Sequence, residues 1–550
     1  MPASPFDTHD VFNQPPPFPV INGVETDPVL VGALDHALDA ESEKALLEHG
    51  AFWGSYEARE LARLATTTPP QLMTHDAQGR RIDQVEHHPA YHALMRHSAE
   101  AGLSVPPVVA RGPAHAHRGL LRAARLYITA QTEPVHLISH CATHAAGPLL
   151  EQLPDERAGP WLDGVRSRRY DHRPNAVGIK SGLTLSIGLT EKQGGVEPLD
   201  TTTMAAPTAA NHHRLTGHKW FVSAPMSDGL MILAEAPGGP SAFLVPRLRA
   251  DGSSNSLRLM RLKTTLGLKA CAIAEIELAE AEGYLIGGEG DGPLLLGQTL
   301  DRLRLDAAIV ASGQMRGALS VAVHHCRNRS VAGDRLVDLD LMTRVLADMT
   351  LDVAAGTVLA MRLASAADAA PHDPLEAAYL RLVLPAAKYW IAKTGIAVAA
   401  EALECLGGNG FVEAGVMARI YRDAPGAALW AGPGNVLALD LLDVLDEDPR
   451  ALDAVIDEIA DELGRDGAVS ADVIRAAATA CREDRGSARI LIEQLALAAA
   501  AAALHRYSPR AITGAFIETR LSGPWRASYG MLDSRYDCAG IIDYAFHGLY

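Results

Sequence analysis

The sequence lacks C-x-x-C cysteine pairs and the pattern of a secretion signal. Its six cysteines are scattered over 550 residues with no C-x-x-C pair, which is typical of reduced thiols rather than of a disulfide framework. The N-terminal segment has no basic region followed by an apolar one, so we expect no signal peptide. The alanine-rich run 496–504 is too short and too weakly apolar to span a bilayer. We therefore expect a cytoplasmic protein with no membrane partner.

Positive charge is also scarce. The net charge of −17 argues against a surface that binds nucleic acid as a whole, although a local basic patch stays open. About half of the residues (48%) are hydrophobic, which is typical of a folded globular protein. A chain of this length is expected to form roughly three to four domains or subdomains.

The composition and the spacing of apolar residues change three times along the chain. Residues 1–30 are rich in proline and predict an extended arm that is partly polyproline II. Helical spacing of apolar residues follows, then short apolar runs separated by turn residues, and then long helical patterns. We therefore predict a mainly α protein with a central β-domain, a small barrel or sandwich. The expected parts are an arm and helical domain (1–180), the β-domain (181–290), a helical bundle (291–446) and a C-terminal helical extension (447–550).

Individual elements can be predicted within these parts. One long helix is expected to end near 367, and another to span 374–406, to bend at Pro385 and to end at Gly407. A shorter helix is expected over 119–131, with helical spacing again over 146–153. The predicted strands are 182–190, 218–223, 230–236, 241–246 and 273–280.

Three short motifs could contact a ligand. "LTEKQGG" (189–195) offers a hydroxyl and backbone N–H groups, but it could equally be an ordinary turn. "HKWFVS" (218–223) could be a wall for a flat ring or simply a packed strand. "LGGNGF" (406–411) resembles an anion-cradling loop, yet it is not G-x-G-x-x-G and follows no strand. A Rossmann dinucleotide site is therefore a poor interpretation.

Three histidines recur at helical spacing in "HLISHCATH" (136–144). His136, His140 and His144 would share one face of a helix, a spacing that a zinc site could use. The H-E-x-x-H pattern is absent, and we expect no carboxylate near them. Core or cavity-lining histidines are the favoured interpretation, and no metal is expected.

Taken in order, the motifs resemble those of one family. T-E-x-x-G-G, K-W-F-x-S, R-x-x-x-G, G-G-N-G-F and R-x-x-R-D-A over about 150–440 resemble the acyl-CoA dehydrogenase family. Further stretches resemble its AidB-like, adaptive-response branch, so that the resemblance covers essentially the whole chain. They are "VFNQPPPF" (11–18), a segment at 69–95, "GHKWFVSAPMSD" (217–228) and "IGGEGDG" (286–292).

The resemblance implies a noncovalent FAD, a family that commonly forms tetramers, and a set of cofactor-binding residues. Thr190 and Ser223 match positions that hydrogen-bond the flavin ring, and Arg329 matches an arginine that reaches the cofactor pyrophosphate from a neighbouring subunit. The full set that the resemblance implies is Leu189, Thr190, Gly195, Phe221, Val222, Ser223, Arg329, Gly407, Gly408, Trp430, Gly432 and Asn435.

The departures from the family pattern concern its chemistry. The family's glutamate, which takes a proton from the substrate, is expected directly after Trp430, where this chain has Ala431. The second position from which some members supply the base is Leu303. The sequence therefore predicts no catalytic residue. Other departures are Val196-Glu197 after the T-E motif, Ala332, Lys269 and Cys271.

The AidB resemblance also raises DNA binding through the C-terminal helices. Phosphate contacts need clustered basic residues, and four arginines recur at roughly helical spacing on what could be one face. Asp443 stands where a basic residue would be expected, so that duplex binding is doubtful. The candidate residues are Arg475, Arg482, Arg485 and Arg489.

Three functions follow as alternatives. The first is an AidB-like FAD flavoprotein with weak or no acyl-CoA dehydrogenase activity and a role in the response to alkylation damage. The second is a flavin-dependent oxidoreductase on another substrate, with His140 or His144 as its base. The third is a scaffold that binds DNA or protein.

Overall fold

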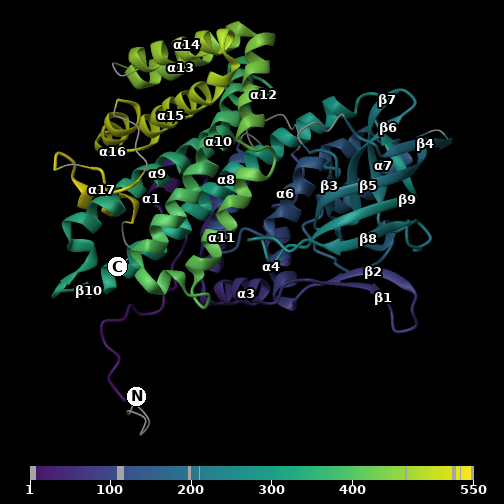
Figure 1. Cartoon of the computed structure of the whole chain (residues 1–550), viewed down its shortest axis with the longest axis horizontal. Helices are drawn as coiled ribbons and strands as arrows, with labels where there is room; N and C mark the ends of the chain where they lie inside the picture. The colour runs from purple at the N-terminus through teal and green to yellow at the C-terminus, as the bar shows by residue number, and fades with distance from the viewer. Residues whose placement is uncertain are drawn as a thin grey trace.

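The computed structural model describes residues 8–107, 117–195, 200–209, 211–464, 467–522, 528–532 and 534–546. Figure 1 shows an extended N-terminal arm, a helical bundle, a β-domain at one end of the molecule and a layer of C-terminal helices on the bundle. The structure is mainly helical with one central β-domain, which confirms the predicted fold class.

The N-terminal part is helical apart from one hairpin. Its helices are α1 (Pro28–Leu34), α2 (Ala40–Trp53), α3 (Tyr56–Thr67), α4 (Pro89–Glu100), α5 (Arg118–Thr132), α6 (Leu137–Ala146) and α7 (Asp155–Arg166). Short capping side chains start several of them, such as Asp27, Asp39 and Ser55. The helical spacing over 146–153 gives a 3₁₀ helix, Gly147–Gln152, rather than an α-helix.

The prediction of helix throughout 31–180 is wrong for one segment. Strands β1 (Gln71–His75) and β2 (Arg81–Glu86) form an antiparallel hairpin. Val85 enters the core of the β-domain, and Arg81 donates to the Leu259 carbonyl at 3.1 Å. The hairpin is stabilised by this long-range packing, which a local helical pattern does not reveal.

The β-domain is a seven-stranded sheet whose strands are joined in a ring. Its order is β3-β6-β4-β5-β9-β7, with β7 paired back to β6 and β8 paired to β9. All five predicted strands are present, and β4 and β8 are additional. The strands are β3 (Leu185–Gly188), β4 (Met204–Ala209), β5 (His212–Ser223), β6 (Gly229–Ala236), β7 (Gly239–Pro246), β8 (Leu257–Leu262) and β9 (Ile273–Ile286).

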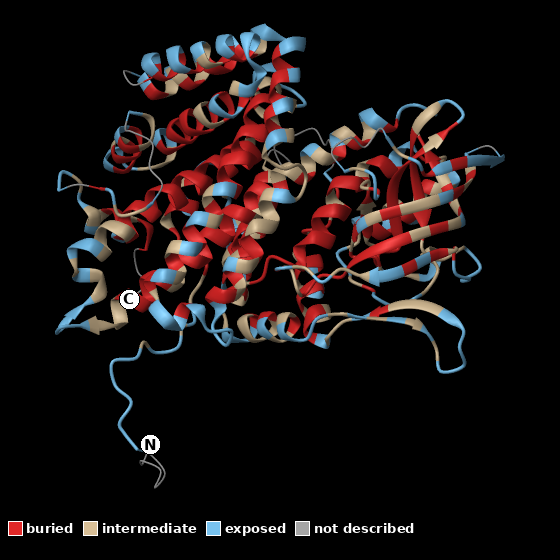
Figure 2. Cartoon of the chain, viewed as in Figure 1, coloured by how far each residue is buried: buried red, intermediate tan, exposed pale blue. Residues whose placement is uncertain are grey.

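Long helices form the bundle beside this sheet. Asp373 accepts a hydrogen bond from the Leu375 N–H at the start of α10, which runs without interruption through Pro385 and ends before Gly407. Figure 2 shows the buried residues concentrated along these helices and inside the sheet. The helices are α8 (Gly292–Asn328), α9 (Asp340–Ala369), α10 (Pro374–Cys405), α11 (Val416–Leu429) and α12 (Gly434–Glu447).

A buried ion pair joins the N-terminal helices to the bundle. Arg122 of α5 donates to both carboxylate oxygens of Asp306 of α8 at 2.6 and 2.8 Å. Because both side chains are almost fully buried, the pair fixes the position of these two helices only while both partners are present.

The C-terminal extension consists of helices that cover the bundle. Alanines fill most of the buried face of α15, and small side chains allow helices to approach closely. The helices are α13 (Pro449–Leu463), α14 (Gly467–Glu483), α15 (Ala488–Tyr507), α16 (Arg510–Phe516) and α17 (Cys538–Ala545).

Three described segments are long and apolar enough to cross a membrane by length and composition alone. They are Asp340–Ala369, Val416–Glu447 and Arg485–Tyr507. In the first and third, 94% and 72% of the apolar window is buried inside the protein. The second segment is divided into α11 and α12 by the turn at 430–433. Packing within this fold therefore accounts for the hydropathy of the two buried segments.

Candidate functional site

The turn between α11 and α12 contains Ala431 and has an unusual backbone conformation. Ala431 has a φ of 55° and Gly432 a φ of 113°, so that the chain reverses in a left-handed conformation at both residues. Arg304 Nε donates to the Ala431 carbonyl at 3.1 Å, and Lys388 Nζ donates to the Gly432 carbonyl at 2.6 Å. Two cations from α8 and α10 thus hold consecutive carbonyl groups of the turn.

The carboxylates beside this turn are already engaged. Arg304 forms ion pairs with Asp440 of α12 and with Asp301, the latter at 2.9 Å. Burial raises the pKa of Asp440 even though Arg304 opposes that shift. Leu303, the second position considered for a base, is buried in the core. The turn therefore presents the Ala431 methyl group beside two basic side chains, and none of the carboxylates named here is free of an ion pair.

Lys388 is the main residue at this turn that sequence reasoning missed. Its side chain is completely buried in the middle of α10. Burial, followed by the charges of Arg304 and Lys393, lowers the pKa of Lys388 to about 7. The available signal was a lone lysine in the apolar run "LPAAKYWIA" (384–392), because a charge in such a run is rarely accidental.

A second group of predicted residues lies at one edge of the β-domain. Phe221 of β5 is 48% exposed, a large fraction for a phenylalanine. Among the described residues, no hydrogen bond to the side-chain hydroxyl of Thr190 or Ser223 is found. The main chain at Thr190 is bonded to β5, since its carbonyl accepts from the Trp220 N–H at 2.8 Å. The edge therefore presents an apolar ring and two available hydroxyl groups.

A buried ion pair holds the loop that carries Thr190. Lys219 Nζ lies 2.6 Å from Glu191 Oε1, and both side chains are buried. Glu191 also accepts from the Thr201 and Thr203 hydroxyls at 2.5 and 2.7 Å. Burial alone would raise the pKa of Glu191, but these hydrogen bonds, led by that of Lys219, lower it strongly. The glutamate of the T-E motif is thus a structural anchor.

The remaining predicted residues of this edge have different surroundings. Leu189 packs against the core beneath the sheet, and Val222 is fully buried within it. Gly195 lies beside Thr190, and a Cβ there would come within 2.9 Å of the threonine methyl carbon. Glycine is therefore required for the loop to pass this close. Residues 196 and 197 lie outside the described residues.

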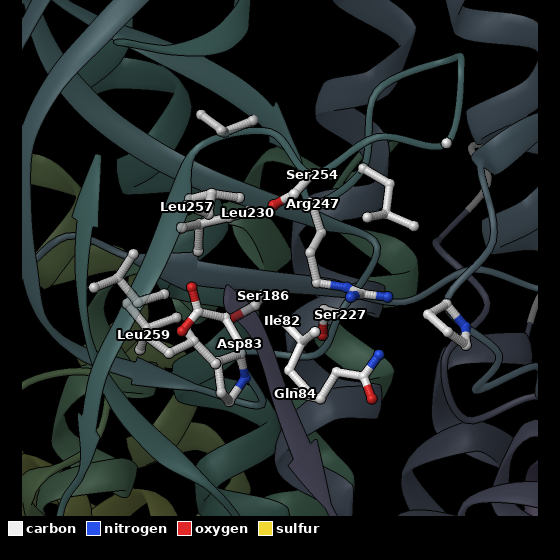
Figure 3. A pocket seen from close by; sticks show the side chains of 18 residues that line it. Ile82, Asp83, Gln84, Ser186, Ser227, Leu230, Arg247, Ser254, Leu257 and Leu259 are labelled. Carbon is white, nitrogen blue, oxygen red and sulfur yellow. The ribbon is translucent and has the colours of Figure 1, made fainter. Parts of the chain in front are cut away.

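Val222 points to a cavity of about 220 Å³ on the other face of β5 from Phe221. Figure 3 shows Asp83, Ser227 and Arg247 around it, with leucines behind them. Each of these three polar residues has one buried atom without a hydrogen-bond partner. A cavity of this size and polarity suits several bound water molecules.

Three predicted cofactor residues, Gly407, Gly408 and Arg329, follow the ends of α10 and α8. Gly407 and Gly408 begin the 3₁₀ segment Gly407–Phe411 before α11, whereas Trp430 follows the end of α11. The 14 residues of α11 span about 21 Å. Arg329, at the end of α8, donates to the Asn13 carbonyl of the arm. Within one chain, Gly407, Gly408 and Arg329 are therefore separated from Trp430, so the predicted cofactor residues form two groups.

The loop before β9 joins the sheet edge to α11. The Leu268 N–H donates to Asp423 Oδ1 at 2.6 Å, and the Ala224 N–H donates to the Ala272 carbonyl at 2.9 Å. Burial raises the pKa of Asp423 to about 6. These two hydrogen bonds connect the edge of the sheet to α11, the helix that leads to the Ala431 turn.

The expectation of no carboxylate near the three histidines is wrong. Glu133 Oε2 lies 2.5 Å from His136 Nδ1, and Ser98 Oγ lies 2.7 Å from His136 Nε2. The set has the composition of a hydrolytic triad, but all three side chains are completely buried, so that no substrate can reach the serine. It is a core network, and "E-P-V-H" (133–136) was its signal.

His140 and His144 make poor bases. Burial lowers the pKa of His140 well below its ordinary value and that of His144 to about 3. His144 Nδ1 is also bonded to the Val105 carbonyl at 2.7 Å. In the described residues, no group of three or more His, Cys, Asp or Glu is arranged to hold a metal ion.

The four C-terminal arginines do not form one basic face. Arg475 and Arg482 lie on α14, Arg485 on the 3₁₀ turn that follows, and Arg489 on α15. Arg475 pairs with Asp457 at 2.5 Å, and Arg485 pairs with Asp446 at 3.0 Å and Asp443 at 3.3 Å. Arg489 donates to Asn435 Oδ1 at 2.8 Å. The prediction that all four share one helix face is wrong, because the helix breaks between Glu483 and Ala488, and acidic side chains neutralise Arg475 and Arg485.

Comparison with known proteins agrees with this geometry. Three family models match: the adaptive response protein AidB N-terminal domain over residues 13–172, the acyl-CoA dehydrogenase middle domain over 186–281 and the acyl-CoA dehydrogenase C-terminal domain over 290–445. AidB of Escherichia coli (strain K12) is 39% identical over 459 residues, which is 84% of each chain.

Solved structures share the same fold. Caenorhabditis elegans ACDH-11 in complex with C11-CoA has a TM-score of 0.83 at 23% identity and covers 95% of both chains. Bd2924 in its apo form has a TM-score of 0.82 at 26% identity and covers 90% of this chain and all (100%) of that one.

The fold and the matching family models together define a protein of the acyl-CoA dehydrogenase class. Within that class, the chain belongs to the AidB-type family of acyl-CoA dehydrogenases. FAD is the cofactor that this membership implies.

Proposed function

We propose that this protein is an AidB-type FAD flavoprotein with little or no acyl-CoA dehydrogenase activity. The observation that carries the proposal is Ala431, whose methyl group occupies the position of the family's proton-abstracting carboxylate. A general base must lie within hydrogen-bond reach of the proton and be able to accept it. A methyl group cannot do so.

The nearby residues do not replace this base. Asp301 and Asp440 pair with Arg304. Lys388 is buried beneath the turn and directs its Nζ atom at a backbone carbonyl. The histidines considered as alternatives are hard to protonate, since burial lowers the pKa of both. We therefore favour a flavoprotein without the family reaction over an oxidoreductase that uses a histidine base.

The residues of this chain fit a flavin. Phe221 would cover part of the flat ring, and the Thr190 and Ser223 hydroxyls would bond its polar edge. The close approach at Gly195 leaves the loop next to Thr190 without a side chain. Bound FAD would supply hydride-transfer chemistry. Trp430, Gly432 and Asn435 would close the site, in a turn that Arg304 and Lys388 hold in place.

A complete cofactor site is proposed to need a second chain. Gly407, Gly408 and Arg329 lie at the far side of α11 from Trp430. A Cβ added at either glycine would have no neighbouring atom within 4 Å, so there is open space beside both residues. A neighbouring copy could present this group to the Thr190 edge. We therefore propose a homo-oligomer, a tetramer as in the family, that acts in the cytoplasm in the response to alkylation damage.

The visible spectrum of the purified protein and a dehydrogenation assay test this proposal. Flavin absorption bands in the protein as isolated, or after reconstitution with FAD, are expected. Acyl-CoAs of several chain lengths, with an artificial electron acceptor, should give no turnover above about one-hundredth of ordinary family rates. Rapid bleaching of the flavin by any acyl-CoA would overturn the proposed lack of activity, and failure to retain FAD would overturn the flavin assignment.

A further inference from the structure

A second cavity, of about 440 Å³, lies where the arm, α2–α3, α5, α8 and α11 meet. This second cavity is separate from the Ala431 turn. The α11 residues that line it are in the first two turns of that helix, whereas Ala431 follows the last. On α8 the lining begins at Gly317, about 21 Å along the helix from Leu303.

Part of the cavity wall is apolar and well ordered by packing. Trp53, Ile128 and Ile420 line it, and their side chains are otherwise buried. The far face of Trp53 stacks on His136 with ring centroids 5.4 Å apart, which fixes the indole. Phe18 of the arm closes another side. The volume and this wall are those of a typical small-molecule site.

The polar part of the wall is mainly cationic, although the protein as a whole has a net charge of −17. Five basic residues line the cavity against two acidic ones. Glu60 is paired with Arg63, and Glu413 with Arg422. Lys269 adds a further charge near Glu413. The basic residues are Arg59, Arg63, Lys269, Arg419 and Arg422.

Three of these cations form no ion pair among the described residues, and the first of them, Lys269, donates to the Thr265 carbonyl. Arg59 donates to the Pro19 carbonyl at 2.8 Å and lies over the Phe18 ring. Arg419 donates to the Thr132 carbonyl at 2.6 Å. The buried Glu133 and Asp423 are within electrostatic reach of Arg419 but are not bonded to it. The cavity therefore keeps an excess of positive charge.

Unused hydrogen-bond donors converge on the same wall. Arg419 Nε and Gln131 Nε2 are buried and have no hydrogen-bond partner. The first turn of α11 also faces the cavity through Gly415 and Val416, and no side chain caps its N–H groups. Buried donors without acceptors are costly, and a helix N-terminus favours a negative charge. All three features would be satisfied by an acceptor-rich, negatively charged group.

We propose that this cavity binds an amphipathic organic anion, with its acid group at Arg419, Gln131 and the α11 N-terminus. Its aliphatic or aromatic body packs against Trp53, Ile128 and Val321. The site is separate from the flavin edge and from the Ala431 turn, so that it does not depend on the proposed function. Because Pro17, Phe18 and Ile21 line it, a bound molecule also packs against the N-terminal arm.

Calorimetric titration of the full-length protein with matched probes tests this site. Decanoate and decyl phosphate share a ten-carbon chain with decanol but differ in the head group. We expect at least one anion to bind one-to-one and about tenfold more tightly than decanol. The two anions distinguish a carboxylate from a phosphate ligand. Equal binding of decanol, no saturable binding of either anion, or tighter binding of inorganic phosphate than of both would overturn the proposal.

Two variants locate the binding. Arg419→Gln removes the charge and is expected to weaken the preferred anion about tenfold, whereas Val321→Trp fills the cavity and should abolish binding. Arg381→Gln, an exposed arginine paired with Glu447, is the matched control and should bind as the parent does. Thermal unfolding of each variant shows that it is folded. Unchanged affinity in a folded Arg419→Gln variant would overturn the assignment even if Val321→Trp does not fold.

Discussion

Lys388 Nζ lies 2.6 Å from the carbonyl oxygen of Gly432, and no carboxylate pairs with this lysine among the described residues. The residue just before that glycine is Ala431, which we propose stands in place of the family's base. The turn thus lies against a buried lysine that has no acidic partner. A buried charge without a counter-charge costs free energy, so that a functional constraint is the natural reason for its presence.

The first prediction concerns the pH dependence of stability. The pKa of Lys388 falls from 10.5 to about 7 on folding. Between these pH values the unfolded chain binds more protons at this site than the folded one, so this lysine makes the free energy of unfolding rise with pH. Lys388→Met should remove that rise and stabilise the protein at pH 7 by roughly 1–3 kcal/mol after loss of the hydrogen bond.

Urea unfolding of both proteins between pH 6 and 10.5 measures the effect. Lys393→Met is a suitable control, because Lys393 lies nearby on the same helix and is exposed. Parallel stability curves for the parent and Lys388→Met would show that Lys388 keeps an ordinary pKa.

A second prediction restores the carboxylate. Ala431 already has a Cβ at positive φ, so that Ala431→Glu adds little backbone strain. The new carboxylate would face Arg304 and Lys388, which favour its charged form. We expect acyl-CoA dehydrogenation to rise by about 10²-fold or more over the parent. Ala431→Gln has the same shape without the base, and equal activity in the two variants would refute this role for the position.

The third prediction concerns retention of the cofactor. Phe221 is 48% exposed and lies against Lys263, so that Phe221→Ala should alter the stability of the fold by less than about 1 kcal/mol. Loss of the ring should nevertheless weaken FAD binding about tenfold, as should Ser223→Ala to a smaller degree. The measurement is the FAD dissociation constant from flavin fluorescence. Thr216→Ala, an exposed position on the same strand, should leave it unchanged.

The large-scale fold could be predicted from the sequence because its signals are local. Apolar residues at spacings of three and four mark the long helices, and short apolar runs between turn residues mark the strands. The β1–β2 hairpin could not be predicted in this way, since it is stabilised by Val85 entering a core more than a hundred residues away along the chain.

The site was predictable in part for a similar reason. The order of motifs identified Thr190, Phe221 and Ser223, which the structure brings to one edge. The same motifs give no indication that Gly407 and Arg329 lie far from Trp430, because the spacing along a sequence does not reveal the length of an intervening helix. Lys388 and Glu133 belong to none of the motifs that resemble the family, and their roles emerge only from burial and from the atoms they contact.

The fourth prediction concerns the ion pair between α5 and α8. Asp306→Asn leaves Arg122 buried without a counter-charge and should reduce the free energy of unfolding by about 3–5 kcal/mol. Burial would raise the pKa of Asp306, but Arg122 outweighs it and the pKa is lowered. The stabilisation is therefore present above the unfolded pKa and is lost as the pH falls through the folded one. Chemical unfolding at pH 7 and pH 3 should show a smaller difference between parent and variant at the acid pH.

The last prediction concerns duplex DNA and the C-terminal helices. Arg485 is paired with Asp443 and Asp446, and Arg475 with Asp457, so that few of these charges are available to phosphate. A labelled 30-base-pair duplex should show no binding by fluorescence anisotropy at 150 mM salt, and Arg485→Gln should alter low-salt binding less than twofold. The double variant Asp443→Asn/Asp446→Asn frees Arg485 and should increase low-salt binding, with a steeper salt dependence. Tight binding by the parent protein that weakens sharply in Arg485→Gln would show instead that DNA displaces these aspartates.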